Sequence, residues 1–110
     1  YKRQTPLRID LVTETYALLD PPVLAPYAPP STDELAQAVA DCAERSSCIL
    51  LENHAVTTTG ATLLEAFNRL ELLEDAARLT LLAGKLEGVH GLDAAQRSEL
   101  DALRGRPRRE

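Results

Sequence analysis

Residues 48–83 read CILLENHAVTTTGATLLEAFNRLELLEDAARLTLLA, and this stretch decides the fold. It begins with a continuous apolar run, residues 48–51, of the kind found in strands that are buried on both faces. After a polar triplet, residues 55–59 are rich in β-branched side chains, which favour further extended structure. We therefore predict two strands here, with the polar triplet between them.

The same stretch continues into the longest helical pattern of the chain. Thr62 and Glu65 have the spacing of a capping box, which predicts a helix of roughly twenty residues that ends at Gly84. Its apolar side chains recur at intervals of three and four residues and form a wide stripe: Leu63, Ala66, Phe67, Leu70, Leu73, Ala77 and Leu81. Other apolar residues flank this stripe: Leu64, Leu72, Leu79 and Leu82. Because one neighbour cannot cover so much apolar surface, we expect a second contact surface, such as a subunit interface.

The residues before this stretch predict shorter elements. We expect an extended lead-in over residues 1–12, a single short helix over residues 13–19 and a strand over residues 23–27. This strand should lie near a sheet edge, because Pro26 cannot donate a hydrogen bond to a neighbouring strand.

Two more helices are predicted from capping boxes. Ser31 with Glu34 predicts the start of a helix that covers one face of the sheet. Asp93 with Gln96 predicts a short last helix, which Leu92, Leu100 and Leu103 could dock on the rest of the chain. The elements together indicate an α/β class.

The composition excludes several classes of function. Hydrophobic residues make up 45% of the 110 residues and charged residues 26%, as in an ordinary globular chain. The net charge of −5 argues against binding to a nucleic-acid backbone. The one basic cluster lies in residues 104–110, which we interpret as a solvated basic tail rather than a binding arm.

The two cysteines, Cys42 and Cys48, do not have the spacing of a CxxC motif. We expect two buried reduced thiols rather than a disulfide, which fits a cytoplasmic setting. No apolar run reaches the roughly 18–20 residues that are needed to span a bilayer, so we expect no membrane association.

His54 is the strongest candidate for chemistry. A histidine at the exit of a buried strand is held rigidly and can face a cleft, which suits metal ligation, although a hydrogen-bonded structural role fits a lone histidine as well. Glu52 and Asn53 flank it and could orient it, meet a substrate, or only form hydrogen bonds at the strand end. His90 lies in a glycine-flanked loop that we expect to be exposed.

Several segments resemble the class II aldolase/adducin family, whose enzymes are of the L-fuculose-phosphate aldolase type. They are residues 24–35, LAPYAPPSTDEL, residues 49–55, ILLENHA, then Gly60, and residues 64–71, LEAFNRLE. In that family a loop-to-helix segment leads to a strand that ends in an NHG motif, followed by a turn glycine and a long helix. The resemblance covers roughly residues 6–103 and is made specific by the spacing of its pieces.

The resemblance implies a three-layer α/β/α fold with a central, largely antiparallel sheet, assembled as a homotetramer. It also implies a divalent metal, commonly Zn²⁺, held by an HxH motif and a third histidine, to which His54 corresponds. Such enzymes cleave a ketose phosphate, a sugar phosphate, by retro-aldol chemistry through a metal-stabilised enediolate. The alternatives are a sister enzyme of the family (a decarboxylase, epimerase or dehydratase) or a non-catalytic, adducin-like interaction module.

Two departures from the family pattern affect this interpretation. Ala55 stands where the family has a glycine, which is a mild change unless that position needs a positive φ angle. The HxH motif, the acid/base glutamate and the phosphate-binding loops belong to the family's N-terminal half. We therefore expect residues 1–110 to be the C-terminal portion of one such domain, with the other metal ligands outside the chain. Because one imidazole cannot hold a catalytic zinc ion, we expect this chain alone to be inactive, and we assign it no catalytic residue.

Overall fold

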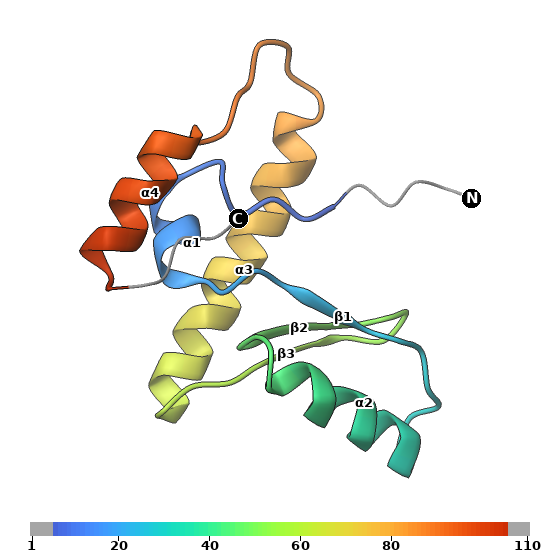
Figure 1. Ribbon diagram of the computed structural model, residues 1–110. Helices are drawn as coiled ribbons and strands as arrows, with labels where there is room; N and C mark the ends of the chain where they lie inside the picture. The colour runs from blue at the N-terminus through green and yellow to red at the C-terminus, as the bar shows by residue number, and fades with distance from the viewer. Residues whose placement is uncertain (1–5, 106–110) are drawn as a thin grey trace. The chain divides into compact units, whose positions relative to one another are not determined.

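The computed structural model describes residues 6–105, so residues 1–5 of the predicted lead-in and residues 106–110 of the predicted basic tail lie outside the described part. Within the described residues, four helices and three strands follow one another, with the labels used in Figure 1. They are α1 (Thr13–Leu18), β1 (Val23–Ala25), α2 (Asp33–Ala43), β2 (Cys48–Leu51), β3 (Val56–Thr58), α3 (Leu63–Ala83) and α4 (Ala94–Leu103). Residues 6–12 contain neither helix nor strand, which agrees with the predicted lead-in.

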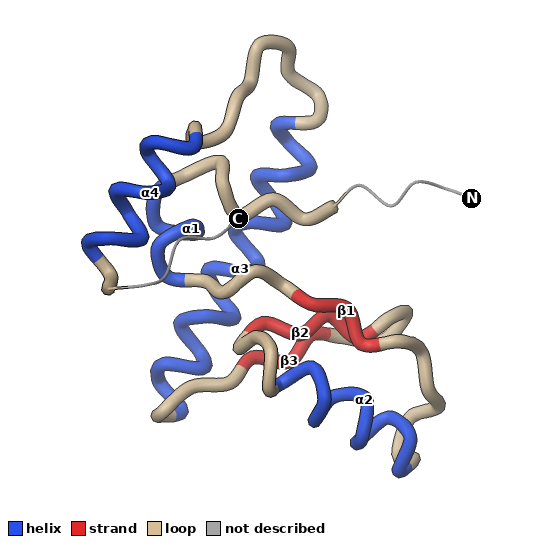
Figure 2. The backbone as a smooth tube through the Cα atoms, in the orientation of Figure 1, coloured by secondary structure: helices blue, strands red, loops and turns tan. Residues whose placement is uncertain are grey.

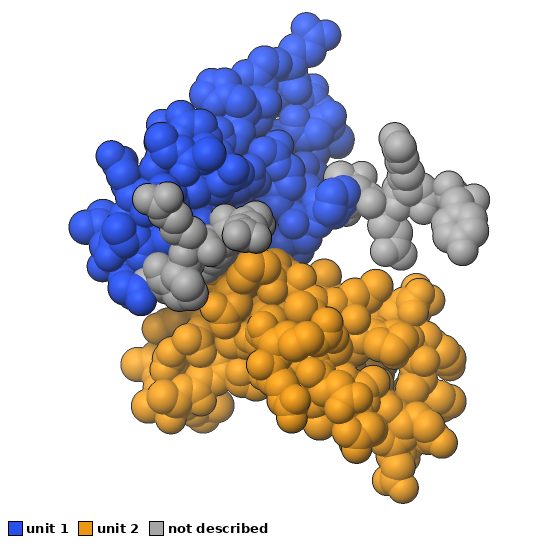
Figure 3. All heavy atoms as spheres, viewed as in Figure 1, with its two compact units in different colours: residues 1–18, 72–110 blue, residues 19–71 orange. Residues whose placement is uncertain are grey.

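The chain divides into two compact units, which Figure 3 shows in different colours. Unit 1 consists of residues 1–18 and 72–110, and unit 2 consists of residues 19–71. The helix α3 contributes its first residues to unit 2 and the remainder to unit 1. Each unit is described below by itself.

Unit 2 is built on a three-stranded sheet in which β2 is the central strand (Figure 2). β1 pairs with β2 in parallel, with Ala25 opposite Leu51, and β3 pairs with β2 antiparallel, with Thr58 opposite Cys48. The α/β class and the edge position of β1 are confirmed. The described sheet is mixed, and β1 ends at Ala25 because Pro26 cannot continue its hydrogen bonds.

The core of unit 2 consists of small and aliphatic side chains between α2 and the sheet. Ala25, Cys42 and Ile49 are almost fully buried there, and Ile49 is 0% exposed. Val39 and Ala38 of α2 pack against this cluster, so α2 covers one face of the sheet, as predicted (Figure 1). Cys42 and Cys48 are both free thiols and both buried, which confirms the prediction of reduced cysteines.

The N-terminus of α2 differs from the sequence prediction by one residue. Thr32, and not Ser31, is the N-cap, and its hydroxyl oxygen accepts a hydrogen bond from the backbone N–H of Leu35 at 3.3 Å. The predicted box between Ser31 and Glu34 was therefore wrong. Ser31 instead adopts a positive φ of 62° as the chain turns from the proline-rich loop into the helix.

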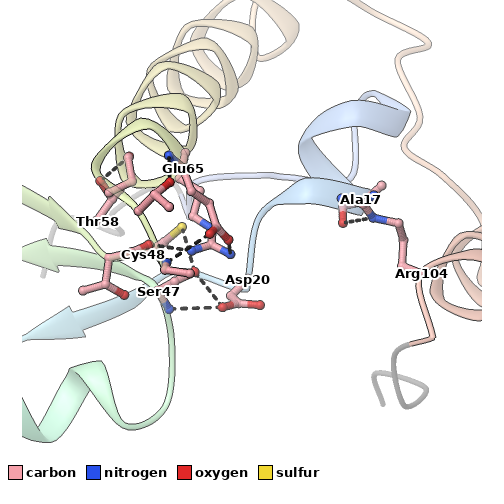
Figure 4. Close-up of polar contacts among 12 residues, drawn as sticks. Ala17, Asp20, Ser47, Cys48, Thr58, Glu65 and Arg104 are labelled. Carbon is pink, nitrogen blue, oxygen red and sulfur yellow. Dashed lines mark hydrogen bonds and ion pairs between the residues drawn. The ribbon is translucent and has the colours of Figure 1, made fainter.

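The start of β2 is fixed by hydrogen bonds to the segment that precedes β1. The Asp20 carboxylate accepts hydrogen bonds from the hydroxyl of Ser47 at 2.6 Å and from its backbone N–H at 3.2 Å (Figure 4). The Ser46 hydroxyl donates to the carbonyl of Pro21 at 2.8 Å. These bonds hold β2 beside the chain segment that leads into β1, its parallel neighbour.

The first turns of α3 attach to β3. The Thr58 hydroxyl donates to the carbonyl of Ala66 at 2.8 Å, and the Arg69 guanidinium donates to the carbonyl of Thr59 at 2.6 Å. The intervening Gly60 lies so close to the helix that a Cβ atom there would be 2.8 Å from the backbone nitrogen of Ala66. Glycine is therefore required at this turn for steric reasons.

The predicted cap of α3 is present with one change of partner. The Thr62 hydroxyl accepts a hydrogen bond from the backbone N–H of Glu65 at 3.1 Å. The Glu65 carboxylate accepts from the N–H of Ala61 at 3.0 Å and not from that of Thr62. The helix ends at Ala83, directly before Gly84, as predicted.

The apolar stripe predicted on α3 is only partly buried. Leu73 is buried, and so are Ala76 and Thr80, whereas Leu63 is 88% exposed and Leu81 is 70% exposed. Both ends of the stripe therefore remain uncovered, as expected of a helix with more apolar surface than one neighbour can cover. Several large apolar side chains remain exposed on the first turns of the helix: Leu63, Leu64, Phe67 and Leu70. This exposed surface agrees with the expectation that the chain has a further contact surface.

Unit 1 joins α1 to α4 through a buried polar contact. The Tyr16 hydroxyl donates to the Asp101 carboxylate at 2.9 Å, and both residues are buried. The capping box between Asp93 and Gln96 is present in full at the start of α4. Leu103 is 81% exposed, so the predicted docking was wrong for this residue, whereas Leu92 and Leu100 are partly buried. The buried Asp101 carries the contact with α1.

The lead-in before α1 is held in unit 1 by polar contacts. The Arg8 guanidinium forms a two-pronged ion pair with Asp10, at 3.0 and 2.9 Å, and the backbone N–H of Arg8 donates to the Thr80 hydroxyl at 3.0 Å. Gly91 packs directly against this ion pair, where a side chain would collide with both partners. In the same unit, the Arg104 guanidinium donates to the carbonyl of Ala17 at 3.4 Å (Figure 4).

None of the helices within the described residues is long and apolar enough to cross a membrane.

The burial of Ile49 predicts how the stability of the chain responds to truncation of this side chain. Because Ile49 is 0% exposed, Ile49→Val should lower the free energy of unfolding by about 0.5–1.5 kcal/mol, and Ile49→Ala by about 2–5 kcal/mol. Leu24→Val on the same sheet is the matched control. Because Leu24 is 49% exposed, this substitution should lower the free energy of unfolding by less. Urea denaturation measures all three, and an equal loss for Leu24→Val and Ile49→Val would contradict this core.

The ion pair between Arg8 and Asp10 predicts a pH-dependent stability. The hydrogen bond from Arg8 holds the pKa of the Asp10 carboxyl below its usual value. This stabilisation is therefore present above the unfolded-state pKa of about 3.9 and is lost as the pH falls through the lower pKa of the folded state. Asp10→Asn should lower the free energy of unfolding by about 0.2–1 kcal/mol at pH 7, and the difference from wild type should shrink below about pH 4.

Chemical denaturation at pH 7 and at acidic pH measures this difference. Glu71→Gln is the control, because the exposed Glu71 carboxylate forms no hydrogen bond or ion pair with the described residues. An effect of Asp10→Asn that is equal at both pH values would show that the ion pair does not stabilise the fold.

Candidate functional site

The three predicted site residues, Glu52, Asn53 and His54, form the turn that joins β2 to β3. The turn closes through a hydrogen bond from the backbone N–H of His54 to the carbonyl of Leu51 at 3.1 Å. The N–H of Leu51 in turn donates to the carbonyl of Ala55 at 2.7 Å. His54 is therefore held at the end of the central strand by main-chain bonds, while its side chain is exposed.

The turn needs a positive φ angle at Asn53. Its φ is 54°, in the left-handed region, where asparagine is one of the few non-glycine residues that are well tolerated. Among the described non-glycine residues only Ser31 also has a positive φ, so Ala55 does not. The replacement of the family's glycine by Ala55 is thus compatible with this backbone. Asn53 acts here through its backbone conformation.

Glu52 links the turn to the end of the neighbouring strand. Its backbone N–H donates to the carbonyl of Ala25 at 3.1 Å, and its carboxylate accepts a hydrogen bond from the N–H of Tyr27 at 3.0 Å. Ala25 is the last residue of β1, and Tyr27 lies two residues beyond it. The sequence left three roles open for Glu52: orienting His54, meeting a substrate, or forming hydrogen bonds at the strand end. Its contacts show hydrogen bonds at the strand end.

The Tyr27 backbone N–H is a part of this arrangement that the sequence did not indicate. The carboxyl ends of two parallel strands lie at the same edge of a sheet, so the residues that follow them come together. The pairing of β1 with β2 was not predicted as parallel, and without that pairing nothing in the sequence connects Tyr27 with Glu52. A signal was present in Pro26, which directly precedes Tyr27 and cannot donate a hydrogen bond to a neighbouring strand. It could have suggested that the N–H of Tyr27 needs an acceptor other than the next strand.

The donor set around His54 is incomplete for a metal ion. Within residues 6–105, no group of three or more His, Cys, Asp or Glu side chains comes together in a way that could hold a metal. Both cysteines are buried, and burial raises the pKa of the Cys48 thiol, which disfavours the thiolate that metals bind. His90 lies in unit 1 and is exposed, as predicted. The described part of the chain thus offers one accessible imidazole at this turn and not a complete site.

The chain matches the family described as Class II Aldolase and Adducin N-terminal domain over residues 4–81. It is 38% identical over 61 residues to an L-fuculose phosphate aldolase of Methanococcus maripaludis, a match that covers 56% of this chain and 33% of that protein. It is 35% identical over 77 residues to the 3-oxo-tetronate 4-phosphate decarboxylase of Escherichia coli K12, covering 70% of this chain and 36% of that protein. The chain therefore spans about a third of the length of these relatives.

Solved structures give the same relationship. The crystal structure of YgbL from Klebsiella pneumoniae, a proposed aldolase/epimerase/decarboxylase, superimposes with a TM-score of 0.76 at 32% identity and covers 91% of this chain and 49% of that one. YgbL from Escherichia coli gives a TM-score of 0.69 at 30% identity, over 88% of this chain and 44% of that one. The superposition and the family match over residues 4–81 agree, and the chain belongs to the class II aldolase and adducin family.

Proposed function

We propose that this chain is part of a metal-dependent lyase that acts on a phosphorylated sugar or sugar acid. The observation that carries the proposal is the match to two relatives named for such chemistry, an aldolase of L-fuculose phosphate and a decarboxylase of 3-oxo-tetronate 4-phosphate. Both reactions break a carbon–carbon bond next to a carbonyl group. Retro-aldol cleavage of a ketose phosphate is the reaction we favour, with decarboxylation, epimerisation and dehydration as the sister activities.

In this proposal His54 is one ligand of a divalent metal, Zn²⁺ or another ion. Its support is the position of His54 at the end of the central strand, on a turn closed by main-chain hydrogen bonds, with an exposed side chain. A catalytic zinc ion takes three protein ligands, so the remaining ligands have to come from residues outside this chain. When bound, the metal supplies Lewis acidity that polarises a substrate carbonyl.

The same proposal extends to assembly and cellular setting. The chain would be a portion of one aldolase/adducin-type domain, in the C-terminal part of that domain, and would act as a homotetramer in the cytoplasm. The exposed apolar side chains Leu63, Leu64 and Phe67 on α3 support a subunit contact, because a surface of this kind is seldom left in water. The free thiols Cys42 and Cys48 fit a reducing compartment.

An adducin-like interaction module is the second candidate function. The incomplete donor set of the described residues and the exposed apolar side chains of α3 favour it. The two functions differ in what His54 does, because an interaction module has no use for a metal ligand. Substitution of His54 therefore separates them.

The proposal predicts that metal binding by the protein encoded by the complete reading frame depends on His54. His54→Ala should weaken zinc binding by more than the roughly 10- to 100-fold that follows loss of an outer-shell partner, and lyase activity should fall with it. His90→Ala is the matched control and should leave both unchanged, since His90 is the other histidine of the chain and is exposed. Elemental analysis after dialysis, together with competition against a chromophoric chelator, measures the effect.

Two outcomes would contradict the enzyme proposal. Unchanged zinc content in His54→Ala would exclude His54 as a ligand. If the reading frame upstream of Tyr1 encodes neither an HxH motif nor an acid/base glutamate, no metal site of this kind can form. A protein partner whose binding survives His54→Ala, in a protein that holds no zinc, would support the interaction module instead.

A further inference from the structure

The turn that holds His54 is connected to the neighbouring strand by one side chain. β1 and β2 run parallel, with Ala25 opposite Leu51 as the last pair of the ladder. Beyond this pair the ladder does not continue, because Pro26 follows β1 and the turn follows β2. The Glu52 carboxylate crosses this point and accepts the hydrogen bond from the backbone N–H of Tyr27 at 3.0 Å.

The Glu52 side chain takes the place of a main-chain hydrogen-bond acceptor at the end of the sheet. Pro26 has no N–H, so the first main-chain donor after β1 is that of Tyr27. Because the N–H of Glu52 donates to the carbonyl of Ala25, a continued parallel ladder would bring the N–H of Tyr27 to the main-chain carbonyl of Glu52. The strand β2 ends at Leu51, however, and the bond that forms goes to the Glu52 side chain. The carboxylate supplies the acceptor, and hydrogen bonds to an ionised acceptor are shorter and stronger than those between neutral groups.

The two bonds of Glu52 act together. Its backbone N–H is fixed to the carbonyl of Ala25 at 3.1 Å, and its side chain is fixed to Tyr27, two residues further along the same segment. The backbone of His54 is held on both sides, by Asn53 at a φ of 54° and by the bond from the N–H of Leu51 to the carbonyl of Ala55. Loss of the hydrogen bond between the Tyr27 N–H and the Glu52 carboxylate would loosen the first residue of the turn.

We propose that Glu52 is a positioning residue for His54: its carboxylate clamps the β2–β3 turn to the backbone of Tyr27 and so presents the imidazole in one orientation for metal ligation. This inference rests on the proposed function of His54. It differs from a substrate-contacting role for Glu52, because the carboxylate is used by a main-chain donor within the chain. It also explains why a long side chain stands at this position, since the acceptor has to reach the adjacent segment.

The test compares two substitutions of Glu52 in the protein from the complete reading frame. Glu52→Gln keeps an amide oxygen that can accept the bond from Tyr27, whereas Glu52→Ala removes the acceptor. We expect zinc affinity to fall about tenfold in Glu52→Ala and to stay within about twofold of wild type in Glu52→Gln. Glu71→Ala is the control, as this exposed glutamate on α3 forms no hydrogen bond or ion pair with the described residues, and it should bind zinc as wild type does.

A second readout follows the clamp itself without any metal. In protein labelled with ¹⁵N-tyrosine, the Tyr27 amide proton should exchange with solvent about fivefold faster in Glu52→Ala than in wild type or Glu52→Gln. Melting temperatures of all variants, measured without metal, separate this local effect from a general loss of stability. If Glu52→Ala binds zinc more weakly but the Tyr27 amide proton does not exchange faster, the proposed positioning role of Glu52 is wrong.

The remaining outcomes distinguish this inference from the proposed function. If His54→Ala loses zinc while Glu52→Ala binds it as wild type does, the positioning role is wrong and the proposed function stands. If Glu52→Gln is as weak as Glu52→Ala, the charge and not the clamp matters, and the inference is again wrong. If His54→Ala keeps its zinc, the proposed function fails and this inference fails with it.

Discussion

The pairing of β2 with a strand on each side is the constraint on which unit 2 depends. Ile49 lies at the middle of this pairing, opposite Val23 on one side and Thr57 on the other, and is fully buried. The central strand is only four residues long, so its position has to be fixed at both ends. Asp20 fixes the start through Ser47, and Glu52 fixes the end through Tyr27. The backbone of His54, three residues after this strand, is held to the strand by its hydrogen bond to the carbonyl of Leu51.

The sheet shows how a short strand can place an exposed side chain at one edge without a large core. Parallel pairing brings the ends of β1 and β2 to one edge, and the antiparallel return of β3 creates a tight turn at that same edge. The turn exposes the His54 side chain while main-chain bonds satisfy its backbone N–H. Within residues 6–105, no group of three or more potential metal ligands comes together at this turn or elsewhere.

Most local signals in the sequence, which span three or four residues, were accurate. The caps at Thr62 and Asp93 form as the spacing indicated, and both apolar or β-branched runs around His54 became strands. The error at Ser31 is of the same local kind: Thr32 is equally suited to cap a helix, and the turn out of the proline-rich loop decided between the two. The stripe on α3 shows a limit of local patterns: periodicity shows which side chains share a face but not how much of that face is covered.

The sequence by itself determined the α/β class, the order of the elements and the placement of His54 at the exit of the central strand, because these follow from propensity, periodicity and capping. Its resemblance to the aldolase/adducin pattern identified the family, which the match over residues 4–81 established. Only the tertiary structure decided that β1 lies parallel to β2, and therefore that the carboxylate of Glu52 meets the backbone of Tyr27, 25 residues earlier in the chain. A contact between residues so far apart depends on which strands pack together, and no local pattern contains that information.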